Sequence, residues 1–200
     1  MNGVDERPAF EEAPAVKYDR TVIAYHGCDA AVAKRVLSGA RFKPSENDYD
    51  WLGSGIYFWE FGHDRALRFA EQERKRGKIK KVAVVGAILQ LGNCFDLMDT
   101  KFTDELTVAF EMLKGIHEQP GRSLPVNSGK TPDKKVRRLD CAVLNLYFTR
   151  LAERGETYDT VRCGFVEGPP AFDGSGIRRQ SHVQVAVRNP HCIVGVFRPR

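Results

Sequence analysis

The fold is decided by the stretch TVIAYHGC, residues 21–28, together with a second stretch, LGSGIYF, residues 52–58. The first opens with β-branched and aromatic side chains, which predicts a buried strand that ends at His26-Gly27. The second predicts another strand over residues 55–59. A helical pattern of apolar side chains follows each of them, over residues 30–38 and 63–76.

The remainder of the chain mixes helical and strand patterns. The mostly apolar run KVAVVGAILQL, residues 81–91, predicts a strand in the centre of a sheet. Two more helices and three more strands are predicted, over residues 103–117, 139–154, 160–167, 182–188 and 193–197. Because these elements do not alternate strictly between strand and helix, the sequence predicts an α+β fold and not a doubly wound sheet.

Composition restricts the class of protein. The chain has 200 residues, 42% hydrophobic and 28% charged, which predicts one globular domain over residues 19–200. Residues 1–18 mix acidic side chains with prolines and predict a disordered leader, not a signal peptide. No apolar run approaches the roughly 20 residues that cross a bilayer, so we expect no membrane contact and a cytoplasmic location. The five cysteines are irregularly spaced, which predicts free thiols and no metal site.

The net charge is +5, and the excess of basic residues lies in the second half of the chain. This is compatible with an anionic partner such as nucleic acid, and equally with an ordinary soluble protein that happens to be basic. Two basic clusters stand out, Arg74, Lys75, Arg76, Lys78, Lys80 and Lys81, and Lys130, Lys134, Lys135, Arg137 and Arg138. Since the second lies in a loop rich in proline and glycine, it is the better candidate for a nucleic-acid contact.

Three short blocks follow one another in a fixed order along the chain. They are Tyr25-His26-Gly27-Cys28, then Gly53-Ser54-Gly55-Ile56-Tyr57-Phe58, and finally a late strand that reads QVAVRNP, residues 184–190. This order resembles the ADP-ribosyltransferase superfamily, in its poly(ADP-ribose) polymerase-like and diphtheria-toxin-like branch with a His-Tyr-Glu signature. The resemblance covers residues 21–70 and 181–197. It implies a split mixed β-sheet with flanking helices, and NAD as a substrate.

The resemblance also implies which residues bind NAD. It implies that His26 forms a hydrogen bond with the 2′-hydroxyl of the adenine-side ribose and that the backbone of Gly27 pairs with the nicotinamide carboxamide. A side chain at position 27 would crowd the nicotinamide ring. It stacks Tyr57 on the nicotinamide with Phe69 as a second wall, and aromatic faces suit a flat cationic ring. Cys28 and Gly55 complete the implied contacts, the glycine because it lets the backbone approach closely.

One position departs from the family pattern. Gln184 stands where the family has a glutamate, which holds a ribose hydroxyl and offsets the positive charge of an oxocarbenium-like transition state. A neutral glutamine keeps the hydrogen bond but stabilises that charge less, by about 2–4 kcal/mol. Glu167, at the end of the preceding predicted strand, is the candidate for the missing charge. His182 shares a strand face with Gln184 and is a candidate for orienting the acceptor.

We therefore expect a mono-ADP-ribosyltransferase that moves ADP-ribose from NAD to a macromolecular acceptor, either protein or nucleic acid. The compact chain suits a toxin-like effector with a neutralising partner protein. Two alternatives stay open at this point. One is an NAD glycohydrolase, with water as acceptor, and the other is a module that binds NAD or ADP-ribose without turnover.

Overall fold

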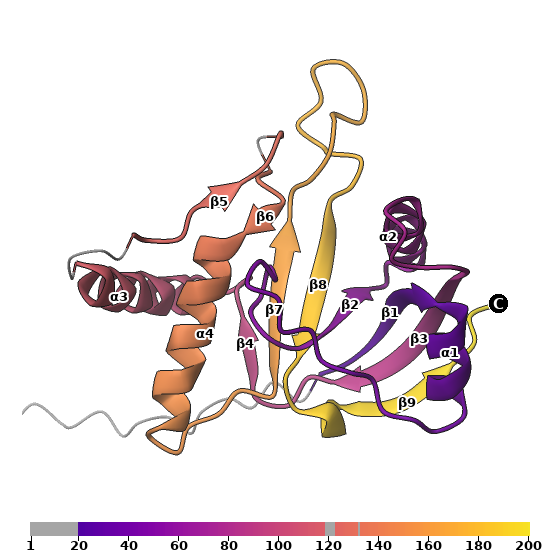
Figure 1. Ribbon diagram of the computed structural model, residues 1–200, viewed down its shortest axis with the longest axis horizontal. Coiled ribbons are helices and arrows are strands. Elements are labelled where there is room, and N and C mark those ends of the chain that lie inside the picture. The colour runs from indigo at the N-terminus through magenta and orange to yellow at the C-terminus, as the bar shows by residue number, and fades with distance from the viewer. Residues whose placement is uncertain (1–19, 119–122, 132) are drawn as a thin grey trace, which may run out of the picture.

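The structure is a computed structural model that describes residues 20–118, 123–131 and 133–200. The leader predicted for residues 1–18 lies outside these ranges. Within them the chain forms four α-helices and nine strands, which confirms the predicted α+β class (Figure 1). In chain order they are β1 (Thr21–Asp29), α1 (Ala30–Leu37), β2 (Ile56–Glu60), α2 (His63–Lys75), β3 (Val82–Gln90), β4 (Cys94–Asp96), α3 (Thr100–His117), β5 (Asn127–Ser128), β6 (Val136–Arg137), α4 (Arg138–Ala152), β7 (Thr160–Phe165), β8 (His182–Val187) and β9 (Ile193–Phe197).

Seven of the strands form one mixed sheet in the order β4-β7-β8-β2-β1-β3-β9. Strands β4 and β7 run parallel, and every other neighbouring pair is antiparallel. The two short strands β5 and β6 form a separate hairpin just before α4. The chain thus brings β2 and β8, which are more than a hundred residues apart in sequence, next to each other in the middle of the sheet.

The pairing between β1 and β2 is interrupted. These strands meet over two residue pairs, Ala24 with Glu60 and Tyr25 with Trp59, although β1 pairs with β3 along nine residues. Beyond Tyr25 the ladder stops, and the imidazole of His26 reaches the backbone carbonyl of β2 instead. We call this interruption the seam. It divides the sheet into a half made of β4, β7, β8 and β2 and a half made of β1, β3 and β9.

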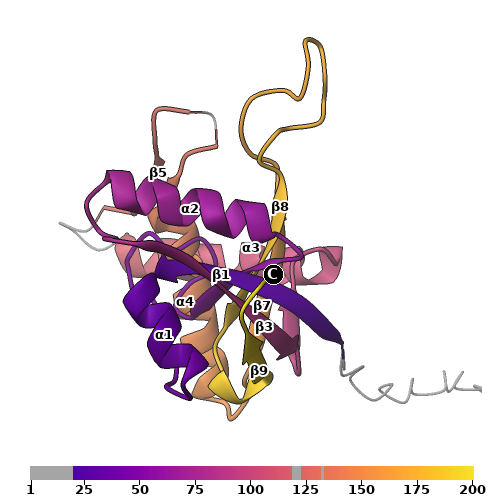
Figure 2. The ribbon, with the colours of Figure 1, turned by 90° about the vertical axis from the view of Figure 1, so that its right-hand side faces the viewer.

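Helices cover both faces of the sheet. On one face, α1 contributes Ala33 and Val36 to a core that includes Phe58 and Val85. On the opposite face α2 crosses β1 and β3, and α4 packs on β7 and β8 through Leu144 and its neighbours. Figure 2 shows α1 and α2 on either side of β1 and β3. The seam therefore lies between α2 and α4, on the face that these two helices share.

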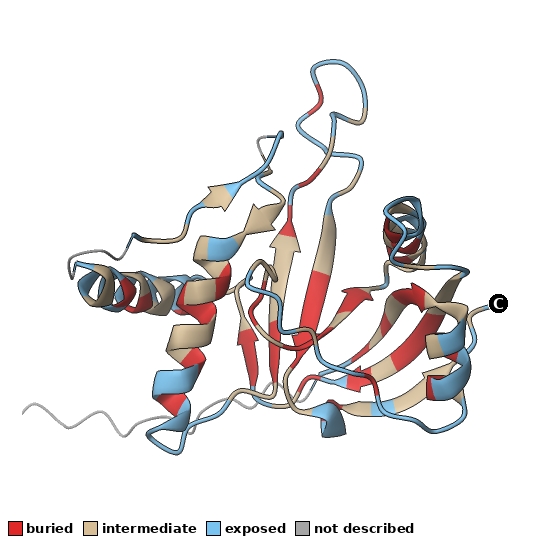
Figure 3. Ribbon diagram, viewed as in Figure 1, coloured by how far each residue is buried: buried red, intermediate tan, exposed pale blue. Residues whose placement is uncertain are grey.

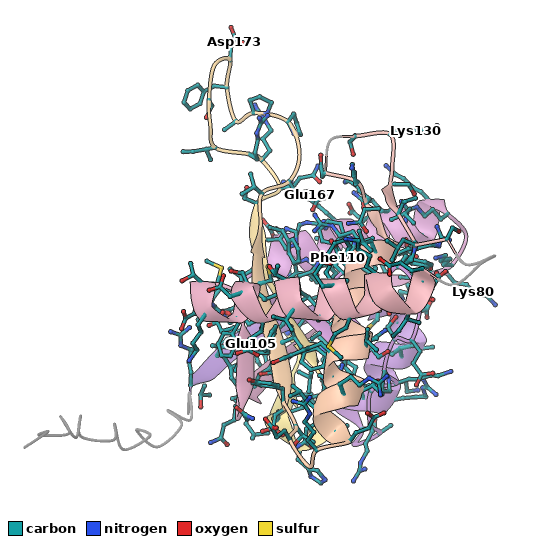
Figure 4. The ribbon with its side chains drawn as sticks, turned by 90° about the vertical axis from the view of Figure 1, so that its left-hand side faces the viewer. Lys80, Glu105, Phe110, Lys130, Glu167 and Asp173 are labelled. Atoms are coloured by element: carbon teal, nitrogen blue, oxygen red, sulfur yellow. The ribbon has the colours of Figure 1, made fainter. Side chains whose placement is uncertain are left out.

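Burial follows this layering. The buried residues concentrate in the strands of the large sheet and on the inner sides of the helices (Figure 3). The segment between β7 and β8 projects away from the body and is mostly exposed, except for Glu167 near its base and Ser175. Figure 4 shows Glu167 at that base and Asp173 at the outer tip. No helix in the described parts of the chain is long and apolar enough to cross a membrane.

Several predicted strands change. The first strand does not end at His26-Gly27 but continues to Asp29, because β3 pairs with it as far as that residue. The strand over residues 81–91 is not central, since β3 lies second from the edge, beside β9. Strands β4, β5 and β6 were not predicted, because two or three residues are too few for a periodic pattern.

Candidate active site

A cavity of about 650 Å³ opens at the seam, between α2 and the β5–β6 hairpin. It is lined by residues from β1, β2, α2, β8 and the loops next to them. Seven of the nine predicted site residues lie on its wall, namely His26, Gly27, Gly55, Tyr57, Phe69, Glu167 and Gln184, whereas Cys28 and His182 do not line it. The fold therefore brings together side chains that are up to 158 positions apart, from His26 to Gln184.

Cys28 lies away from the cavity. Its side chain is 6% exposed and belongs to the core beneath α1, together with Ala33 and Val36. Burial raises the pKa of this thiol to about 11, so that it stays protonated and apolar in character. Of the predicted NAD contacts, that of Cys28 is the one that the structure does not bring to the cavity.

His26 sits at the seam, between the rings of Phe42 and Phe58, at 5.0 and 5.6 Å between ring centroids. Its Nδ1 lies 2.7 Å from the carbonyl oxygen of Tyr57. Because a carbonyl oxygen only accepts, Nδ1 carries the proton and Nε2 keeps a free lone pair. Burial lowers the pKa of His26 below its usual 6.5, although the hydrogen bond acts in the opposite direction. The imidazole is therefore neutral, with Nε2 as an acceptor.

Gly27 is required by packing. A Cβ at this position would overlap the backbone carbonyl oxygen of Ala66 in α2 and would lie 3.0 Å from the carbonyl carbon. The space into which a side chain would point is thus occupied by the helix. The glycine therefore has a reason in packing, because it lets α2 lie close to β1. The contact of its backbone with the nicotinamide carboxamide stays a prediction.

Tyr57 holds the loop in front of its own strand. Its hydroxyl accepts a hydrogen bond from the N–H of Leu52 at 2.8 Å and donates one to the carbonyl of Gly53 at 2.6 Å. Gly53 has a φ of +73°, which favours glycine, and the side chain of Asn145 occupies the place of its missing Cβ. The same Asn145 accepts from the N–H of Ser54 at 2.9 Å. The ring of Tyr57 thus borders the cavity while its hydroxyl is used inside the protein.

Glu167 is 2% exposed and lies between two cations. Its carboxylate is 2.8 Å from Nη2 of Arg65 and 2.6 Å from Nζ of Lys135. Burial alone would raise its pKa, but the hydrogen bonds and charges of Lys135 and Arg65 outweigh burial and hold the pKa below the usual 4.5. The glutamate is therefore ionised, yet its charge is more than balanced. It lies two residues beyond the end of β7 at Phe165, and does not close that strand as predicted.

His182 is placed behind this carboxylate. Its Nδ1 lies 2.6 Å from the carbonyl oxygen of Gln180, so that Nδ1 carries the proton. The same nitrogen is 3.6 Å from Oε2 of Glu167. Burial lowers the pKa of His182 below 6.5, which keeps the ring neutral. The register of β8 against β7 pairs His182 with Phe165 and Gln184 with Cys163. His182 and Gln184 are two positions apart on one strand, which confirms that they share a strand face.

Buried polar atoms without a hydrogen-bond partner gather at this wall. Three of the seven such atoms among the described residues belong to residues that line the cavity, Nε1 of Trp59, Nε of Arg65 and Oε1 of Gln184. A fourth, Nε2 of His182, belongs to the same strand face as Gln184, two positions away. Trp59 and Gln184 face each other across β2 and β8 in the same register. Leaving such a group unpaired costs about 1–3 kcal/mol, so a cluster of them indicates a place where a polar ligand completes the set.

Among the cavity residues that the sequence did not assign to the site are Trp59, Arg65 and Lys135. The alternation of side chains along β2 was a signal for Trp59, since it shares a face with Tyr57. No signal in the sequence pointed to Arg65, and Lys135 is predicted only as part of a basic cluster that could contact nucleic acid. Their role depends on a contact with Glu167 that is made across 102 and 32 positions.

The lining of the cavity carries an excess of positive charge. Six basic side chains, Lys43, Arg65, Arg76, Lys78, Lys135 and Arg138, stand against three carboxylates, Asp50, Glu73 and Glu167. Each of the two more buried carboxylates is shared by two cations, since Glu73 contacts Arg76 and Lys78. Such a lining favours an anionic ligand.

Comparison with known proteins gives one relative. The chain is 31% identical over 150 residues to the uncharacterized protein MJ0359 of Methanocaldococcus jannaschii, a match that covers 70% of this chain and 63% of the relative. The matched part thus spans less than two thirds of the relative's length. No family model matches the chain, and no solved structure matches it.

Proposed function

We propose that this protein is an NAD-dependent mono-ADP-ribosyltransferase, which transfers ADP-ribose from NAD to a macromolecular acceptor. One observation carries the proposal. His26, Tyr57 and Gln184, which come from three separate strands, all line one cavity at the seam of a mixed sheet. They are the three positions of the family signature, and the interrupted sheet agrees with the split sheet that the resemblance implies.

The cavity fits a dinucleotide. Its volume of about 650 Å³ lies inside the range of roughly 300–1,000 Å³ that is usual for ligand sites. The excess of basic side chains suits a diphosphate, and the aromatic rings of Tyr57, Trp59 and Phe69 suit a flat cationic ring. The unpartnered atoms of Trp59, Arg65 and Gln184 supply two donors and one acceptor for ribose hydroxyls or a carboxamide.

The residues of this chain have distinct tasks in the proposed reaction. Neutral His26 accepts a hydrogen bond from a ribose hydroxyl through Nε2, and the ring of Tyr57 orients the nicotinamide. Oε1 of Gln184 accepts from the other ribose next to the bond that breaks. Arg65 and Lys135 both contact the carboxylate of Glu167 directly. Glu167 therefore has little charge left to offset the positive charge that develops on the ribose.

This charge balance favours slow, single transfers over chain formation. A neutral Gln184 and a doubly paired Glu167 together provide little net negative charge for an oxocarbenium-like transition state. The neutral Gln184 also favours a second candidate function, a module that binds NAD or ADP-ribose without turnover. An NAD glycohydrolase would use the same residues with water as acceptor.

The test is nicotinamide release from NAD by the purified full chain, with cell lysate as the source of acceptors. We expect release by the wild type and by the control Lys34→Gln, whose side chain is exposed on α1. His26→Ala and Tyr57→Ala should abolish it, and Gln184→Ala and Glu167→Ala should show which side chain supports the chemistry. Free ADP-ribose as the sole product would favour the glycohydrolase.

NAD binding without any release would contradict the transferase and favour the binding module.

The toxin-like role belongs to the same proposal and has its own test. Expression of the wild type should arrest growth, whereas expression of Tyr57→Ala should not. Growth that is equal in both cultures would remove the toxin-like role and, with it, the reason for a neutralising partner protein.

A further inference from the structure

The two basic clusters of the sequence lie around one opening. Arg76 and Lys78, which follow the end of α2, line the cavity on one side. Lys135 and Arg138, from the β5–β6 hairpin and the start of α4, line it on the other. The fold therefore brings together clusters that are about fifty residues apart in the sequence, so that they form one rim, which we call the basic rim.

Ion pairs within the protein do not cancel the charge of this rim. Glu73 is shared by Arg76 at 2.7 Å and Lys78 at 3.3 Å, and Glu167 is shared by Arg65 and Lys135. Each group of two cations and one carboxylate keeps one net positive charge. Arg138 is balanced by Asp48 at 2.9 Å.

Three other lysines belong to the same region, Lys43, which lines the cavity, and Lys130 and Lys134 in the turn of the β5–β6 hairpin. All three are exposed, and no carboxylate of the described residues lies within ion-pair distance of them. Figure 4 shows Lys130 at the outer end of the hairpin. Several exposed lysines beside a cationic cavity suit a chain with several phosphates better than a single anion.

We propose that the macromolecular acceptor is a single-stranded nucleic acid whose phosphates lie on the basic rim. This inference rests on the proposed function. The wall where the reaction would occur is recessed, since Gln184 and Trp59 are 7% and 3% exposed. A nucleotide stacked in a duplex cannot reach such a wall, so the reacting nucleotide has to be unpaired. The phosphates on either side of it remain outside, at the lysines.

The transfer step balances without a further reactant. The bond between C1′ of the nicotinamide ribose and the ring nitrogen breaks, and its electron pair leaves with neutral nicotinamide. A lone pair on an oxygen or nitrogen of the nucleotide forms the new bond to C1′. The proton that this atom carried passes to solvent, which is consistent with a site whose carboxylates are all paired or hydrogen-bonded.

The first measurement is binding of a labelled single-stranded DNA oligonucleotide, and of RNA of the same sequence, in the absence of NAD. With Lys43, Lys130 and Lys134 as three phosphate contacts, affinity should fall about 18-fold between 50 and 200 mM salt, from about 0.7 per contact in the logarithmic slope. The double variant Lys130→Gln/Lys134→Gln should reduce this to about 3-fold. The control Lys34→Gln/Arg35→Gln, on α1, removes the same charge and should leave the 18-fold dependence unchanged.

The second measurement is transfer of labelled ADP-ribose when the oligonucleotide and lysate proteins are offered together. We expect label on the oligonucleotide, reduced at least tenfold in Lys130→Gln/Lys134→Gln, with nicotinamide release into water unchanged. The DNA and RNA arms identify which nucleic acid is used. A duplex of the same sequence should accept at least tenfold less label.

Three outcomes would overturn this inference. They are no oligonucleotide binding at 50 mM salt, the same salt dependence in the double variant and its control, and label on protein alone. Failure of the proposed function gives a different result, namely no nicotinamide release with any acceptor. If salt-dependent binding persisted in that case, the basic rim would still bind nucleic acid, but the acceptor role would be lost.

Discussion

Replacing Gly27 with alanine tests whether this glycine serves the fold or the ligand. The added methyl carbon would lie 3.0 Å from the carbonyl carbon of Ala66 and 3.3 Å from Cβ of Ala70, and would overlap the Ala66 oxygen. Carbon atoms prefer a separation of about 3.5–4.0 Å, so α2 has to move by at least about 0.5 Å. Both alanines are fully buried, and the atoms in the way are mostly backbone, which cannot rotate aside. We expect a loss near the upper end of the range of about 1–3 kcal/mol for overpacking.

The assay is urea unfolding of Gly27→Ala, followed by circular dichroism, beside the matched control Gly115→Ala. Gly115 lies in α3 with no atom within 4 Å of its missing Cβ, so its replacement should raise the free energy of unfolding by about 0.4–1 kcal/mol. If Gly27→Ala unfolds within about 0.5 kcal/mol of the wild type, the packing argument is refuted. If Gly27→Ala is as stable as the wild type but releases no nicotinamide, the glycine is needed for ligand binding and not for packing.

The other predictions concern hydrogen bonds and pH. Trp59→Phe should weaken NAD binding without the loss of a hydrogen bond, because Nε1 has no partner, and its cost in stability comes only from the lost packing of a buried ring. Trp51→Phe should lose about 1 kcal/mol from its hydrogen bond alone, since Nε1 donates to a backbone carbonyl at 2.9 Å. Calorimetry measures the binding and urea unfolding measures the stability. Burial lowers the pKa of His26 and of His182, so the unfolded chain takes up protons that the folded chain does not, and the free energy of unfolding should fall as pH drops below 6.5. His182→Asn should lessen that fall between pH 7.5 and 5.5. Glu167 has a lowered pKa, so its contribution should be lost as pH falls below 4.5, and Glu167→Gln should remove that loss.

Local signals in the sequence were sufficient for most helix ends. Asp29 caps α1 by accepting from the N–H of Ala31 at 2.9 Å, and Gly39 ends it with a φ of +96°. Gly77 ends α2 in the same way, with a φ of +78°. The start of α3 was placed three residues too late, since its cap at Asp99 precedes the apolar pattern. These helix ends depend on neighbouring residues alone, so the sequence predicts them where the cap stands next to the apolar pattern, as at Asp29, but not where it precedes that pattern, as at Asp99.

Contacts over long sequence distances were not predictable in the same way. The place of Cys28 in the core could not be read from its neighbour His26, because the two share a strand face and differ only in their distance from the seam. The group formed by Arg65, Lys135 and Glu167 depends on where the β5–β6 hairpin lies, and that hairpin has two-residue strands with no pattern. The sequence thus predicts which residues border the cavity better than it predicts which charged side chains pair with each other there.

The seam explains why one cavity collects so many polar groups. Within a complete sheet the backbone groups of β1 and β2 would satisfy each other, but here the ladder stops after Tyr25. His26 satisfies one carbonyl through Nδ1, and the unpaired atoms of Trp59 and Gln184 lie farther along the same opening. Since buried groups without partners are costly, the fold retains them only where something else completes their hydrogen bonds. The stability of the sheet and the affinity for a ligand are therefore linked at the seam, and a bound ligand should raise the free energy of unfolding by an amount that its concentration relative to its dissociation constant determines.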